Sequence, residues 1–199
     1  MKKSRMEAFS DGVIAILITI MVLEFKIPAE PTAKALCAMA PVFLGYVLSF
    51  VFIGIYWNNH HHMLQAVHNV NGGILWANLH LLFWLSLVPF VTAWMGHSGW
   101  APFPVACYGV VLLGAGSAYA LLSILLIRHH GKDSVLAKAV GRSGKEIFSV
   151  AAYSSAVALA FVDTRLSGAL YVAVAVTWLV PDRRIERALV AHSQHEHGE

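Results

Sequence analysis

The sequence predicts an all-α integral membrane protein, and three observations carry this prediction. Hydrophobic residues make up 58% of the 199 residues. Charged residues make up only 13%, about half of the roughly 25% that is typical of soluble domains. The apolar residues also fall into runs of helical length, separated by residues that favour turns. We therefore expect the partner surfaces of this chain to be a lipid bilayer and other helices, and we expect no nucleic acid among its partners.

Six apolar segments predict a single six-helix membrane domain that covers residues 1–199. The expected spans are about 8–26, 36–58, 73–95, 103–128, 146–163 and 167–181. The first four reach the ~20 residues that a helix needs to cross the hydrocarbon core of a bilayer. The last two are shorter and are separated only by Asp163-Thr164-Arg165, which predicts a helical hairpin. Residues 183–199 read as a short polar tail, and residues 134–145 as a possible interfacial helix.

The basic residues predict that both termini are cytoplasmic. If the N-terminus lies inside, eleven of the 14 lysines and arginines fall on the inner side and three on the outer side. Such an excess of inner positive charge sets the orientation of membrane proteins. The outer three are Lys26, Lys34 and Arg165. The first apolar segment lacks a small-residue cleavage site, so we expect it to be retained rather than removed as a signal peptide.

The first span begins with an unusual charged cluster, from Arg5 to Gly12. An ionisable residue at the start of an apolar helix needs a partner and is a candidate functional residue. Arg5 is close enough along the chain to pair with Asp11. A helix of 100° per residue places Asp11 about 140° away from Ile16.

Helical periodicity gives the first span two apolar stripes. One contains Phe9, Gly12, Ile16, Ile20 and Leu23, flanked by Thr19, and the opposite one contains Ile14, Ile18, Met21 and Phe25. Because both are apolar, the period alone does not say which face lines a pore. A central helix that is buried all round stays an equal alternative.

The later spans carry polar residues that could meet Asp11. The second span ends in Tyr56-Trp57-Asn58-Asn59, followed by three consecutive histidines at 60–62. These histidines lack the i, i+4 spacing of a helical metal site, so we expect no metal there. We expect instead that Trp57 and one histidine donate to the Asp11 carboxylate, with Asn78 on the same side of the membrane. Pro89 is expected to kink the third span.

Several catalytic and ion-binding motifs are absent from the sequence. It contains no G-x-S-x-G, no H-E-x-x-H, no phosphate-binding glycine loop and no Cys-x-x-Cys. We therefore expect neither an enzyme nor a cofactor. A Thr-Val-Gly-Tyr-Gly run is also absent, which excludes a carbonyl-lined potassium filter. Cys37 and Cys107 are expected to be free thiols.

The R-x-x-x-F-S-D run from Arg5 to Asp11 resembles the motif of prokaryotic members of the transmembrane protein 175 family, the endosomal and lysosomal potassium channels. The likeness continues along the chain. It includes Ile-Thr-Ile-Met-Val-Leu-Glu at 18–24, Tyr56-Trp57 with a following histidine, Asn78-Leu79 and Pro89-Phe90.

This resemblance implies a homotetramer of six-span subunits around a central pore, in a bacterial plasma membrane. It implies a potassium-selective or potassium-preferring cation channel that lacks a selectivity loop, with potassium only as the permeant ion. The first helix of each subunit would form a hydrophobic constriction. The residues implied for the pore are Ile16, Thr19, Ile20 and Leu23, and those for a structural motif network are Arg5, Phe9, Ser10, Asp11, Trp57, His60 and Asn78.

Two other functions remain open at this point. A proton-coupled secondary transporter could use Asp11, Glu24 and the histidines as proton sites. The sequence shows no inverted repeat and no interrupted helix, which are frequent in such transporters. A non-conducting membrane scaffold would account for the apolar first helix but not for its charged motif.

Overall fold

The computed structural model describes residues 3–131, 134, 136–137 and 144–179. All the regular elements in that part of the chain are helices. They are α1 (Ser4–Leu23), α2 (Ala33–Cys37), α3 (Ala40–Gln65), α4 (Gly72–Ser86), α5 (Val88–His97), α6 (Pro102–His130), α8 (Gly144–Leu159) and α9 (Thr164–Leu179). The predicted polar tail at 183–199, and most of the possible interfacial helix at 134–145, lie outside the described residues.

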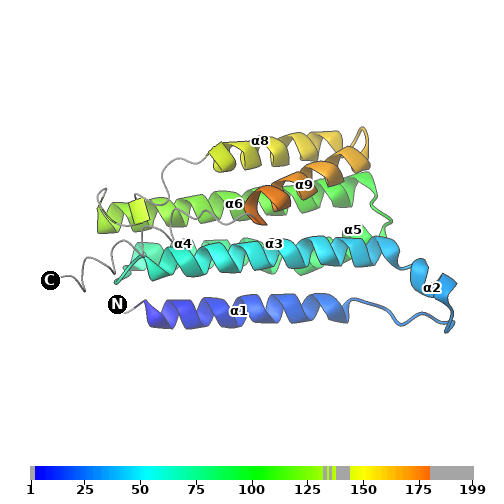
Figure 1. Ribbon diagram of the computed structural model, residues 1–199, viewed down its shortest axis with the longest axis horizontal. Coiled ribbons are helices and arrows are strands. Elements are labelled where there is room, and N and C mark those ends of the chain that lie inside the picture. Colours follow the sequence, from blue (N-terminus) through cyan, green and yellow to red (C-terminus); the bar gives the residue numbers. More distant parts are fainter. Residues whose placement is uncertain (1–2, 132–133, 135, 138–143, 180–199) are drawn as a thin grey trace.

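The long helices lie side by side in one bundle (Figure 1). The short helix α2 projects beyond one end of the bundle, and α1 and α8 lie on opposite edges. Helix α4 packs against α6, α6 against α8, and α8 against α9. Helix α1 packs against α3, α4 and α5. One long side of α1 therefore faces the bundle, and the other side faces away from it.

Four helical segments in the described part are long and apolar enough to cross a membrane. They are α1, α3, the pair α4 and α5 taken together, and α6. Helices α8 and α9 have 16 residues each, or about 24 Å at 1.5 Å per residue. Figure 1 shows that this hairpin runs along only part of α6.

The helix bounds differ from the expected spans mainly at polar ends. Helix α1 begins at Ser4, within the charged cluster, and ends at Leu23. Helix α3 continues to Gln65 and so includes all three histidines. A helix does not require apolar side chains to continue, and hydropathy alone therefore ends these elements too early. The expected segment 36–58 also contains a break between α2 and α3.

Pro89 accounts for the break between α4 and α5. Helix α4 ends at Ser86 and α5 begins at Val88, as expected for a proline that lacks the backbone N–H of a continuous helix. Thr92 Oγ1 donates to the carbonyl of Val88 at 2.7 Å. Ser49 Oγ on α3 is 2.6 Å from the same threonine hydroxyl and 3.0 Å from the Tyr108 hydroxyl on α6. This buried hydroxyl cluster joins α3, α5 and α6.

Two glycines of α6 allow its neighbours to approach closely. The ring of Trp84 packs directly on Gly114, and the Tyr171 hydroxyl lies over Gly109. A Cβ atom at either position would overlap these side chains. Small residues at such contacts are typical of membrane helix packing. The two glycines allow α4 and α9 to pack tightly against α6. Helix α1 in turn packs against α4.

Candidate functional site

The two faces of α1 have very different environments within the subunit. On the inner face, Met6, Ser10, Ile14, Leu17 and Met21 are buried. On the other face the exposed fraction is 56% for Ile16, 40% for Ile20 and 78% for Leu23, against 2% for Ile14. The structure thus removes the ambiguity between the two apolar stripes. The Ile14 stripe packs inside the subunit, and the Ile16 stripe faces outward.

Thr19 lies on the outward face and is exposed. Its hydroxyl donates to its own helix, with Oγ1 at 2.9 Å from the Ile16 carbonyl and 3.2 Å from the Ala15 carbonyl. A hydroxyl has one proton and two acceptor lone pairs. Because the proton is used by the helix, the oxygen remains available as an acceptor on this face.

A chain of buried hydrogen bonds fastens the inner face of α1 to α3 and α4. Asn78 Nδ2 donates to Ser10 Oγ at 2.9 Å, and Ser10 Oγ donates to the Met6 carbonyl at 2.8 Å. The Asn78 amide oxygen lies 2.8 Å from His60 Nε2. Since that oxygen can only accept, Nε2 of His60 must carry the proton. His60, Asn78 and Ser10 are 0–1% exposed, so each protects another from a costly unpaired state.

A second set of contacts between α1 and α3 is more exposed. Trp57 Nε1 donates to Asp11 Oδ1 at 3.0 Å. His61 Nδ1 lies 3.5 Å from Glu7 Oε1, and the rings of Trp57 and His61 are stacked with centroids 5.9 Å apart. These contacts restrict the rotation of α1 about its helix axis at the charged end.

The partners differ in part from those expected. Arg5 is exposed and forms no ion pair with Asp11 among the described contacts. The described histidines at 60–62 form no hydrogen bond with Asp11, and His60 bonds to Asn78 instead. Phe9 is 55% exposed and shares the outward face with Ile16. In the part of the chain that the structure describes, no group of three or more potential ligands is placed to hold a metal ion.

Two contacts at this end of the bundle were missed by sequence reasoning. One is the Glu7–His61 pair, and the other is the bond from Lys3 Nζ to the Leu64 carbonyl at 2.6 Å. A signal for the first was present. Glu7 and Asp11 are four residues apart, as are Trp57 and His61, and residues at that spacing share a helix face. When two helices face each other, two such pairs can form two contacts side by side, here Glu7 with His61 and Asp11 with Trp57.

Comparison with known proteins identifies relatives over nearly the whole chain. Residues 5–89 match the family described as endosomal/lysosomal potassium channel TMEM175. A potassium channel of Chryseobacterium sp. is 50% identical over 189 residues, which cover 95% of this chain and 98% of that protein. A potassium channel of Streptomyces collinus is 32% identical over 177 residues, covering 83% and 86% of the two chains.

A solved structure has the same fold. It is the crystal structure of a lysosomal potassium-selective channel TMEM175 homolog from Chamaesiphon minutus, with a TM-score of 0.79 and 28% sequence identity. The match covers 90% of this chain and 97% of that one. The family consists of ion channels rather than enzymes. With its motif, its helical fold and these relatives, the chain belongs to the TMEM175 family of membrane channels.

Proposed function

We propose that this chain is one subunit of a homotetrameric, potassium-permeable cation channel in a bacterial plasma membrane. Each subunit has six spans with both termini in the cytoplasm and has no carbonyl-lined selectivity loop. The outward stripe of α1 lines the central pore. The names of the relatives support potassium as the permeant ion, and the similarity to a channel crystal structure supports a common arrangement of the subunit.

The contrast between the two faces of α1 carries this proposal. A helix that served only as packing at the centre of the subunit would be covered all round, yet Ile16 is 56% exposed and Leu23 78%. Lipid could also cover an apolar face, but a face in contact with lipid does not need a fixed rotation of the helix. A narrow ring of side chains does need one. The hydrogen bonds of Ser10 and the Trp57 bond to Asp11 set the rotation of α1 at one end.

The proposed mechanism follows from the side chains on this stripe. Four copies of Ile16 that converge on one axis form a hydrophobic constriction, which can gate a pore by excluding water. An ion must lose part of its hydration shell to pass, and potassium loses water more easily than sodium. The free acceptor oxygen of Thr19, one turn further on, can replace part of that shell. Ile20 and Leu23 continue the narrow apolar passage.

The first experiment is a measurement of the reversal potential of the purified protein in planar bilayers, with potassium on one side and sodium on the other. Discrete current steps that reverse toward the potassium equilibrium potential are expected. Steps that reverse near zero would remove the selectivity. The absence of current from folded tetramers, or a slow flux that saturates, would contradict the channel and favour a carrier or a scaffold.

The variant Ile16→Asn tests the constriction directly. We expect higher conductance and weaker selectivity for potassium, because a polar ring keeps the pore hydrated. Val22→Asn is the matched control, since Val22 is also exposed on α1 but lies about 120° away from Ile16 around the helix. Equal conductance and selectivity in wild type and Ile16→Asn would refute the pore assignment.

Asp11→Ala is expected to impair mainly assembly.

A further inference from the structure

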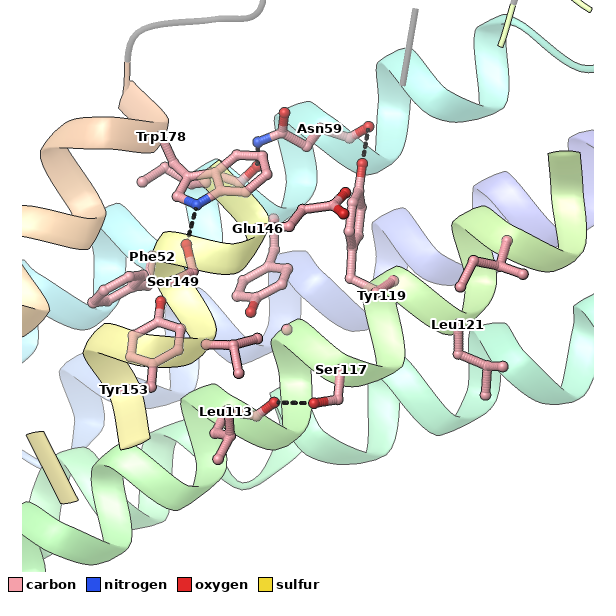
Figure 2. Close-up of a pocket in the computed structure, with 16 residues that line it drawn as sticks. Phe52, Asn59, Leu113, Ser117, Tyr119, Leu121, Glu146, Ser149, Tyr153 and Trp178 are labelled. Carbon is pink, nitrogen blue, oxygen red and sulfur yellow. Dashed lines mark hydrogen bonds between the residues drawn. The ribbon is translucent and has the colours of Figure 1, made fainter. Parts of the chain in front are cut away.

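A cavity of about 360 Å³ lies between α3, α6, α8 and α9, on the part of the bundle where α8 begins and α9 ends. Figure 2 shows its lining residues, which come from all four helices. Most of them are apolar or aromatic, including Phe52, Tyr56, Tyr119, Tyr153 and Trp178. Its volume is in the range of small-molecule sites. The proposed pore stripe of α1 contributes no residue to the described lining.

Glu146 carries the only charge among the described residues that line this cavity. It lies in the first turn of α8, and Figure 2 shows its carboxylate turned toward the Tyr119 ring. Within the described contacts it has no hydrogen bond and no ion pair. The neighbouring Lys145 is directed elsewhere, with Nζ 5.8 Å from the centroid of the Trp178 ring. A half-buried carboxylate without a partner is a costly group to keep in an apolar wall.

Tyr153 provides a second polar group without a partner. Its side chain is 4% exposed and lines the cavity, yet its hydroxyl forms no hydrogen bond among the described residues. The other two lining tyrosines are different, because Tyr56 donates to the Leu112 carbonyl and Tyr119 to the Asn59 carbonyl. Ser149 is also occupied, since it accepts from Trp178 Nε1 at 2.8 Å. On the described wall, the Glu146 carboxylate and the Tyr153 hydroxyl are therefore without a partner.

We propose that this cavity is a binding site for a membrane-soluble organic cation, that is, a single protonated amine on an apolar body. The ammonium group would pair with the Glu146 carboxylate in a charge-assisted hydrogen bond, the strong kind in proteins. An aromatic face beside that carboxylate attracts a cation further, and the Tyr119 ring, toward which the carboxylate is turned, supplies it. The apolar body would lie against Phe52, Leu113 and Ile124.

The same arrangement selects against related molecules of equal size. A neutral alcohol would gain the burial of its apolar body but not the ion pair with Glu146. A carboxylic acid would place a second negative charge beside that carboxylate, which is unfavourable in a medium of low dielectric constant. The order of affinity is therefore amine, then alcohol, then acid.

Calorimetric titration of the full chain in nanodiscs of zwitterionic lipid, at neutral pH, tests this order. The probes are phenylbutylamine, phenylbutanol and phenylbutanoate, with empty nanodiscs as the blank. The amine is expected to bind about tenfold or more tightly than the alcohol, and the acid most weakly. Glu146→Gln is expected to lower the amine affinity to that of the alcohol. Glu30→Gln, which changes an exposed carboxylate in the segment before α2, is the matched control and should change nothing.

A second variant locates the binding independently of charge. Ala120 lines the cavity, so Ala120→Leu should fill it and abolish binding of both the amine and the alcohol. Helix content and elution volume confirm that each variant is folded. Equal binding of amine and alcohol by the wild type, unchanged amine affinity in Glu146→Gln or Ala120→Leu, tightest binding of the acid, or no binding of the amine would each overturn the proposal. None of these outcomes depends on whether the protein conducts potassium.

Discussion

At the junction of α1, α3 and α4, every buried polar side chain of the Ser10–Asn78–His60 chain has a partner. The cavity between α3, α6, α8 and α9 keeps the Glu146 carboxylate and the Tyr153 hydroxyl without one in the described part of the chain. Both regions place polar groups among apolar helices. In the first, the groups satisfy each other and hold a helix in position. In the second, they remain available to a molecule from outside.

Polar residues in an apolar bundle therefore fall into two kinds, those with a protein partner and those without one. A fully paired network strengthens one arrangement of the helices, because breaking any bond leaves a buried group unsatisfied. A polar group without a protein partner has no hydrogen bond that its removal would break, and it stays available to water or to a ligand. Mutations in the two regions should therefore differ sharply in their effect on the free energy of unfolding.

Asn78→Ala is expected to have the largest effect. It removes two hydrogen bonds and leaves His60 and Ser10 without their partner, so the free energy of unfolding should fall by about 2 kcal/mol. A titration with a denaturing detergent, followed by helix content, measures this change. Asn58→Ala is the matched control, because the Asn58 side chain has no hydrogen bond among the described contacts. Equal losses for the two variants would refute the anchoring role of Asn78.

Ser10→Ala and Tyr153→Phe compare the two regions directly, since each variant removes one buried hydroxyl. Ser10→Ala should lower the free energy of unfolding by about 1 kcal/mol, because the Asn78 amide loses its acceptor. Tyr153→Phe should change it by less than about 0.5 kcal/mol, because its hydroxyl has no described partner to lose. The same titration measures both. A larger loss for Tyr153→Phe would show that the cavity wall is also a stabilising network.

Trp57→Phe tests the exposed contact at the end of α1. The change keeps most of the ring but removes the N–H that donates to Asp11. The expected loss is about 0.5 kcal/mol, since the side chain is 43% exposed and water can replace the bond. Trp76→Phe, on a side chain that is 75% exposed, provides the baseline in the same titration. A loss above that of Ser10→Ala would make Asp11 the principal anchor.

Glu7→Gln should have the smallest effect of the series. The Glu7–His61 pair is long, at 3.5 Å, and partly exposed, and such pairs contribute about 0.2–1 kcal/mol at most. We expect a loss of about 0.3 kcal/mol that disappears in high salt, because salt screens exposed charges. The titration repeated at low and high salt measures it. A loss that persists in high salt would indicate contacts other than the ion pair.

Much of the architecture follows from local sequence features. Apolar runs of sufficient length predict α1, α3 and α6, and Pro89 predicts the interruption between α4 and α5. The motif from Arg5 to Asp11 identifies the charged end of α1 as important. Helix ends were less predictable. The polar residues up to Gln65 remain helical, because hydropathy measures suitability for lipid and not helix formation.

The partners within the site were harder to predict. Consecutive histidines project about 100° apart around a helix, so the sequence alone leaves three equivalent candidates at 60–62. The register between α3 and α4 decides among them and places His60 against Asn78. Arg5 is only six residues from Asp11 in the sequence, yet the described partner of Asp11 is Trp57 from α3. Short sequence separation is a poor guide where two helices present matching faces.

The amino-acid sequence is sufficient to predict that this chain forms apolar helices for a membrane, and its motif is sufficient to indicate the family. It did not determine which side of α1 faces outward, since Ile14 and Ile16 are chemically alike and the helix is apolar all round. The packing of α1 against α3, α4 and α5 was needed to distinguish the two faces. The bonds of Ser10 and Trp57's bond to Asp11 fix the rotation of the helix, and that rotation buries Ile14 and leaves Ile16 on the outside.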